Sequence, residues 1–174
     1  MGTSAYPVSR IPFPSFNVTI YAMTNQTWPD ALSRPEPERV QFLLVEFWQR
    51  LRALPDLLVR EEHLLAERNT AGLRDLIIEM MLALNGIQWP PTTVHLNRYL
   101  GASQRAAIEK TLVAPTVNDD SWIGRAVALV VIYRWYAPQL VEKYGLEYPQ
   151  ALEDETWAQL QREVPAWPLT VTTA

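Results

Sequence analysis

Few side chains in this sequence have the chemistry of a metal site or a nucleophile. Its 174 residues include no cysteine and two histidines, His63 and His95. Disulfides, thiolate ligands, cysteine nucleophiles and a histidine-rich metal centre are therefore excluded, and no metal site is predicted. His63 follows Arg60, Glu61 and Glu62, so a carboxylate could hold its imidazole for work as a base. A solvated helix face is the more common explanation of such a charged run.

Glu46 is the residue that we favour as a catalytic base. It is expected on the polar side of a helix that begins near residue 38, with Arg50 one turn later and able to pair with it. If another domain covered that side, the Glu46 carboxylate could take the proton of a substrate hydroxyl. Without such a cover it is one more charge on a solvated face, which is the commoner case.

Aromatic and cationic side chains supply the candidates for substrate contact. These are Trp48, Arg50, Trp89, His95 and Tyr99. Trp48 lies on the apolar stripe of the helix that carries Glu46, and the last three lie in and after the turn Trp89-Pro90-Pro91. Tryptophan is more often a core residue than a platform for a ligand. A histidine such as His95 is more often at the surface than in a cleft.

Carboxylate pairs elsewhere have a structural explanation. Asp119-Asp120 stands where a helix is expected to begin, and acidic residues favour that position because they interact with free amides and the helix dipole. Glu153-Asp154-Glu155 is interpreted in the same way. The scattered glycines form no phosphate-binding loop, and there is no G-x-S-x-G elbow and no Asp-x-Asp pair for two Mg²⁺ ions.

Composition and charge limit the classes of partner. The net charge is -4 and the pI about 5.2, which argues against a nucleic-acid surface. The longest apolar stretch, Trp122 to Ala137, is short for a membrane span and contains Arg125 and Arg134. The first 15 residues contain prolines and no apolar run of the signal-peptide kind. We therefore expect a cytoplasmic protein without membrane or nucleic-acid partners.

The elements that must position these residues are helices. Residues 1–15 and 164–174 contain prolines and are expected to be tails on either side of one domain at 16–163. Apolar and polar residues alternate in Phe16–Tyr21, which predicts one short strand that needs a partner. The later segments predict an all-α fold, an irregular bundle of five to seven helices behind that N-terminal strand. Ser121–Ala137 is apolar nearly all round and is expected to be the central helix.

Caps and helix breakers divide the helical part. Pro35 and Pro37 fit the start of the first helix, and Pro55 ends or bends it. Asn69 or Thr70 is expected to cap a new helix.

Three segments occur in an order that is similar to that of a known family. Phe47-Trp48 is followed by Leu54-Pro55-Asp56-Leu57-Leu58-Val59-Arg60; Leu73–Asn85 is followed by Gly86 and Pro90-Pro91; and a long helix leads into Glu142-Lys143-Tyr144-Gly145-Leu146-Glu147-Tyr148-Pro149 and an acidic helix. Together they resemble the helical C-terminal domain of bacterial nucleotidyltransferases of the aminoglycoside-adenylyltransferase kind. The last segment resembles the closing segment of the streptomycin-type enzymes.

The resemblance covers residues 16–163 and implies half of an enzyme. It implies a helical domain that closes over an acceptor such as an aminoglycoside-like polyhydroxylated amine, with Glu46 as the base to test. The Gly-Ser turn and Asp-x-Asp strand with which the family holds nucleotide and Mg²⁺ have no counterpart here. The resemblance therefore implies no cofactor in this chain, with ATP and Mg²⁺ bound only where a catalytic domain is supplied elsewhere, and a chain that is inactive alone. Phe16–Tyr21 would then be the last strand of the missing sheet, in a truncated, split or free-standing protein.

An interaction module is the alternative function. Such a module would form a homodimer through the exposed strand edge or pair with a separate minimal nucleotidyltransferase, as in toxin–antitoxin systems. Helical toxins of that kind usually carry an Arg-x4-6-His motif, whereas Arg60 and His63 are only three residues apart. A plain structural bundle without a ligand is the third possibility.

Overall fold

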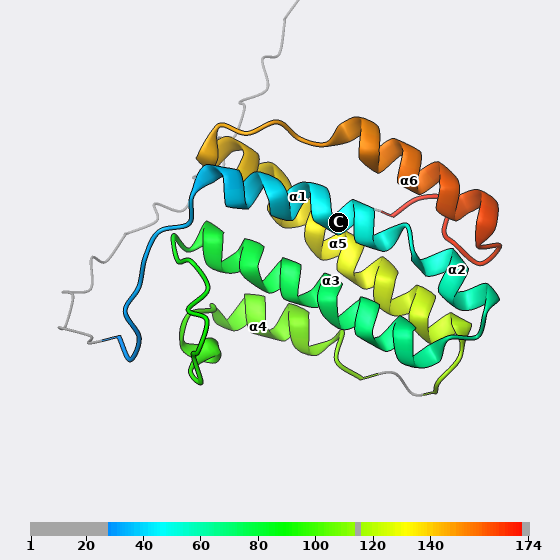
Figure 1. Ribbon diagram of the computed structural model, residues 1–174, viewed down its shortest axis with the longest axis horizontal. Helices are drawn as coiled ribbons and strands as arrows, with labels where there is room; N and C mark the ends of the chain where they lie inside the picture. The colour runs from blue at the N-terminus through cyan, green and yellow to red at the C-terminus, as the bar shows by residue number, and fades with distance from the viewer. Residues whose placement is uncertain (1–27, 114–115, 172–174) are drawn as a thin grey trace, which may run out of the picture.

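The computed structural model describes residues 28–113 and 116–171, which form a bundle of helices (Figure 1). In these two ranges there are six α-helices and one 3-10 turn: α1 (Pro37–Leu51), α2 (Leu54–Val59), α3 (His63–Leu84), η1 (Leu96–Arg98), α4 (Ala102–Glu109), α5 (Asp119–Tyr144) and α6 (Gln150–Glu163). No strand occurs in them, so the predicted all-α bundle is confirmed for this part of the chain. The predicted tail 1–15 and the predicted strand Phe16–Tyr21 lie outside the described residues.

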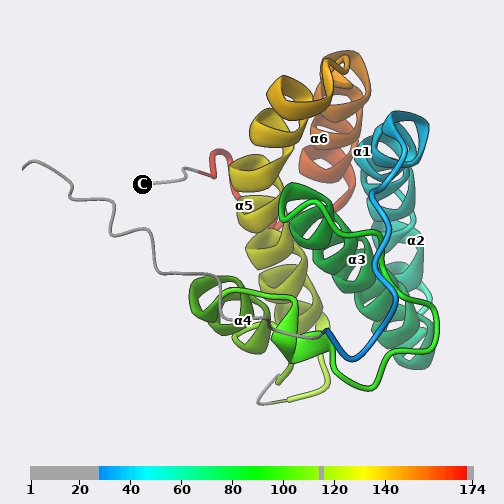
Figure 2. The same cartoon turned by 90° about the vertical axis from the view of Figure 1, so that its left-hand side faces the viewer.

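α3 is the central helix of the bundle (Figure 2). It contacts α1, α2, α4 and α5. From Leu76 to Ala83 every residue except Glu79 is buried, because neighbouring helices cover this helix on all sides. The prediction that residues 121–137 form the central helix is therefore wrong. α5 keeps one side in solvent, where Gly124 and Trp135 are exposed, and an apolar composition by itself does not show whether that side is covered.

α3 also begins earlier than predicted. It runs without interruption from His63, and neither Asn69 nor Thr70 caps a new helix. The Thr70 hydroxyl is buried and donates to the Ala66 carbonyl at 2.8 Å, one turn back along the same helix.

The two ends of α5 follow the local sequence. Asn118 is the N-cap, since its Oδ1 accepts from the Ser121 amide at 3.0 Å, and Asp119 and Asp120 occupy the first turn. The helix continues through Pro138 and ends at Gly145, which has a left-handed φ of 64°. This conformation favours glycine, which has no Cβ to clash with the backbone.

The segment after α6, which the sequence predicts as a tail, packs on the bundle as far as residue 171. Val164 and Trp167 are buried, and the Trp167 ring contacts the Trp157 ring with centroids 5.4 Å apart. The Arg134 Nη1 donates to the Val171 carbonyl at 3.2 Å. Within the described ranges, none of the helices is long and apolar enough to cross a membrane.

Candidate functional site

Trp48, one of the predicted substrate contacts, is a core residue. Its side chain is fully buried between the rings of Phe47 and Tyr133, with centroids 5.5 and 5.2 Å away. The Tyr133 hydroxyl donates to the Leu44 carbonyl at 3.0 Å, and burial raises the pKa of Tyr133 well above its usual value. No surface of Trp48 is open to a ligand.

Glu46 and Arg50 form the ion pair that their spacing predicts. Arg50 Nη2 lies 3.1 Å from Glu46 Oε1, and both side chains are partly exposed. The Arg50 side chain lies across Gly72 of α3 and leaves no room there for a Cβ. The ion pair lies within α1, and it engages the carboxylate that was predicted as a base.

Tyr99 and His95 gather around Asp30 at a different place. Asp30 Oδ2 accepts from the Tyr99 hydroxyl at 2.6 Å and from the Thr93 hydroxyl at 2.5 Å. The hydrogen bond from Thr93 and then that from Tyr99 lower the pKa of the Asp30 carboxyl, and the nearby charge of His95 lowers it further. These contacts fasten the segment before α1 to the segment that contains η1.

The predicted site residues therefore do not converge on one cleft. Trp48 is in the core, and Glu46 is paired with Arg50 on α1, where the Arg50 side chain lies against Gly72 of α3. His95 and Tyr99 belong to the segment around η1, and Trp89, partly buried, precedes it in the chain. Within the described residues, no hydrogen bond or ion pair links Glu46 or Arg50 to that segment.

A hollow between the second half of α5 and the start of α6 has the best-built polar wall. We call it the α5–α6 hollow. Its volume is about 470 Å³. It is lined by Arg134, Pro138, Val141, Glu142, Tyr148, Gln150 and Glu153. Pro138 and Val141 give it an apolar floor, and the other residues place acidic, amide, phenol and guanidinium groups around that floor.

Glu153 is the buried centre of this wall. Glu153 is only 5% exposed. Its Oε1 accepts a hydrogen bond from the Nε of Arg134 at 2.7 Å and lies 2.7 Å from Arg134 Nη2 in an ion pair. Its Oε2 accepts from the Tyr148 hydroxyl. Burial and the hydrogen bond to Glu153 raise the pKa of Tyr148. The Arg134 guanidinium also lies over the Trp157 ring, 4.5 Å from its centroid.

Sequence reasoning missed this cluster. It interpreted Glu153 as one of three acidic residues in a first turn, and Arg134 only as a charge that argues against a membrane span. A usable signal was present, because Glu142 and Tyr148 belong to the closing segment on which the resemblance depends most. The spacing of Arg134 and Glu153 could not reveal their contact, since they lie on different helices.

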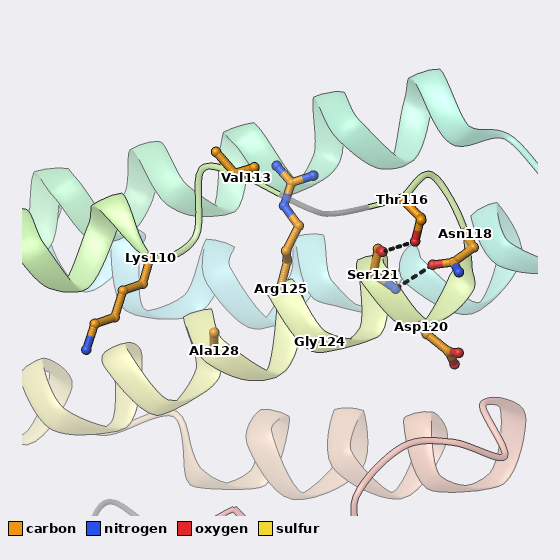
Figure 3. A pocket seen from close by; sticks show the side chains of 9 residues that line it. All are labelled: Lys110, Val113, Thr116, Asn118, Asp120, Ser121, Gly124, Arg125 and Ala128. Atoms are coloured by element: carbon orange, nitrogen blue, oxygen red, sulfur yellow. Dashed lines mark hydrogen bonds between the residues drawn. The ribbon is translucent and has the colours of Figure 1, made fainter.

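A second hollow, of about 490 Å³, lies beside the start of α5 (Figure 3). Arg125 points from its edge toward α3, and its Nη1 and Nη2 contact the Glu67 carboxylate at 2.6 and 3.2 Å. The Arg125 Nε donates to the Thr111 carbonyl at 3.2 Å, and Arg74 donates to the same carbonyl at 2.9 Å. The guanidinium of Arg125 is thus committed to joining α3, α5 and the end of α4, and it is not free to bind a ligand.

His63 lines a third hollow, of about 580 Å³, together with Glu61, Asp119 and Asp120. Its Nδ1 accepts a hydrogen bond from the Trp122 indole at 3.1 Å, so the nitrogen that remains for another partner is Nε2. The described residues contain no group of three histidine or carboxylate side chains that could hold a metal ion.

Comparisons with protein-family models, with curated proteins and with solved structures find no match. The resemblance to nucleotidyltransferases therefore stays a prediction.

Proposed function

We propose that this chain is a binding domain for a polyhydroxylated amine, held in the α5–α6 hollow. The observation that carries the proposal is the chemistry of this hollow, with two glutamates, a tyrosine and an amide around an apolar floor. The one cation in the wall, Arg134, is balanced by its ion pair with Glu153. A hydroxyl-rich cation needs such acceptors for its ammonium and hydroxyl groups, together with an apolar surface for the faces of its rings.

Glu142 is the carboxylate proposed to meet the ammonium group. It is exposed, and no ion pair engages it in the described part of the chain. Glu153 is already held by Arg134 and Tyr148, so its role is to fix those two side chains in the wall. The ordered wall reduces the side-chain entropy that binding would otherwise cost.

The remaining parts of the nucleotidyltransferase hypothesis belong to the same proposal. ATP and Mg²⁺ would be bound by a catalytic domain supplied elsewhere, in the cytoplasm, and this chain would supply the acceptor. Glu46 does not line the α5–α6 hollow and is paired with Arg50, so the proposed binding does not use it as a base.

Calorimetric titration tests the proposal. Kanamycin and streptomycin, as polyhydroxylated amines, should release or absorb heat with a saturable isotherm, whereas sucrose, a polyol without charge, should not. Glu142→Gln removes the charge and keeps the shape, and the loss of one charge-assisted hydrogen bond at a solvent-exposed position should weaken binding roughly tenfold.

The matched control is Glu109→Gln, the same change at an exposed position on α4. It should leave the affinity unchanged. Equal weakening by both substitutions would show that the amines respond to net charge rather than to this hollow. An absence of heat with both amines would refute the proposed function.

A further inference from the structure

We infer that the outward side of α5 is the interface of a homodimer, in which the α5 helices of two copies of this chain pack antiparallel. This inference does not rest on the proposed amine binding, although the surface shares Pro138 with the α5–α6 hollow. It concerns one side of the helix, defined by Ser121, Gly124, Ala128, Val131, Trp135 and Pro138, which we call the α5 face.

The α5 face has no charged residue among its six members, and Gly124, Trp135 and Pro138 leave it open to solvent. Ser121, Ala128 and Val131 are partly covered, and the segment after α6 reaches the helix at Arg134, next to Trp135. These six residues recur at intervals of three and four and so lie on one side of the helix. Gly124 and Pro138 are exposed, and Trp135 is 58% exposed. Such a row of apolar and small side chains, without charge at its centre, has the composition of the core of a protein interface.

Nothing in the described part of the chain accounts for a glycine at position 124. It lies in the interior of a 26-residue helix, where glycine is less favourable than alanine by about 1 kcal/mol. A Cβ added to Gly124 would meet nothing within 4 Å, so no neighbour in the described structure requires a glycine there. Figure 3 shows Gly124 and Ala128 on successive turns of α5, both at the edge of the second hollow. Together they leave a shallow depression on an otherwise continuous helix surface.

The face is complementary to itself in one register. If a two-fold axis passes midway between Ala128 and Val131, the Trp135 of each copy lies opposite the Gly124 of the other. In the same register Ala128 lies opposite Val131, and Ser121 opposite Pro138. The largest side chain of the face thus meets the residue without a side chain, and each small residue meets a larger one. Helices packed in this way lie about 8 to 10 Å apart, depending on the side chains at the contact.

The charges do not oppose this register. Asp120, one turn before Gly124, comes opposite Gln139. Arg125 comes opposite Arg134, but both lie off the α5 face and are paired within the monomer, with Glu67 and Glu153. The match is isologous, because the same patch serves on both copies, which is the usual arrangement in dimers.

The α5 face is by itself smaller than a standard protein interface. From Ser121 to Pro138 the face is about 27 Å long at 1.5 Å per residue and about 10 Å wide. A standard interface buries about 800 Å² per partner, so this face reaches that size only with contributions from its flanks. Val113, 80% exposed, lines the hollow beside Gly124 and Ala128 on one flank. We therefore expect a dimer at the weak end of the range, with a Kd of about 1 to 100 µM.

Sedimentation velocity between about 0.5 and 500 µM chain brackets this Kd and should show a monomer–dimer equilibrium. Trp135→Gly removes the side chain that enters the depression of the partner copy. Gly124→Trp fills the depression with a side chain of the same copy, so that the partner's tryptophan has no room. Each change acts twice in a dimer, so each should raise the Kd at least about 30-fold. Both positions are exposed in the monomer, so the helical circular dichroism should be retained.

The decisive variant carries both changes. In Gly124→Trp with Trp135→Gly, each tryptophan again lies opposite a glycine, and the dimer should return to within a few-fold of the original Kd. Leu64→Ala, at an 87% exposed position on α3, is the control and should not change the Kd. A monomer throughout the concentration range would overturn the inference. So would a dimer that both single variants leave intact, or one that the double variant does not restore.

Discussion

The buried carboxylate of Glu153 allows one electrostatic prediction to be worked out in detail. Glu153→Gln keeps the size and shape of the side chain and an oxygen for Arg134 to bond, but removes the negative charge. Arg134 then contacts a neutral amide instead of a carboxylate at 2.7 Å. The effect tests whether this pair stabilises the packing of α6 against α5.

The magnitude follows from burial. The side chains of Arg134 and Glu153 are 25% and 7% exposed, so water screens this pair much less than a surface pair. A hydrogen bond to a charged group contributes about 1 kcal/mol more than a neutral one, and two nitrogens of Arg134 contact Glu153. We therefore expect a loss of about 2 kcal/mol in the free energy of unfolding, or a fall in Tm of about 6 °C for a domain of this size.

Glu155→Gln is the matched control. Glu155 lies on the same helix and pairs with Arg52 at 3.1 Å, but its side chain is 65% exposed. Surface pairs of this kind contribute about 0.5 kcal/mol or less. Urea unfolding followed by circular dichroism at pH 7 measures both variants. Equal effects of the two substitutions, or no effect of Glu153→Gln, would refute the argument from burial.

Two further predictions concern the backbone of α5 and the tyrosines. Gly145→Ala should lower the free energy of unfolding by about 1 kcal/mol, because alanine is strained at a φ of 64°. Gly124→Ala should raise the free energy of unfolding by a similar amount, because alanine favours the helix and the added Cβ meets nothing within 4 Å at either position. Urea unfolding at low protein concentration measures both variants, and effects of the same sign would contradict the reasoning. Burial raises the pKa of five tyrosines, Tyr99, Tyr133, Tyr136, Tyr144 and Tyr148. These side chains therefore lose their protons at a lower pH in the unfolded chain than in the folded one. The stability that they contribute is present below about pH 10 and is lost as the pH rises further. Tyrosinate absorbance at 295 nm should therefore show delayed ionisation of these five residues until the chain unfolds, and a single titration of all tyrosines at their ordinary pKa, with the helices still formed, would contradict this.

Much of the fold follows from local sequence. The apolar stripe of α1, the ion pair of Glu46 with Arg50, the acidic first turn of α5 and its stop at Gly145 all depend on residues within a turn or two of one another. Helical periodicity and capping act over that distance, so these features can be inferred from local sequence alone.

What the helices bury, and which side chains meet, depends on how the helices pack. Glu153, Asp154 and Glu155 are neighbours with similar chemistry, yet only Glu153 is buried, because α6 turns that position toward Arg134 and Tyr148. Packing likewise made α3 the central helix, enclosed Trp48 and separated Glu46 from His95 and Tyr99. Burial and long-range pairing depend on how helices distant in the chain are arranged, and a period of 3.6 residues carries no information about that arrangement.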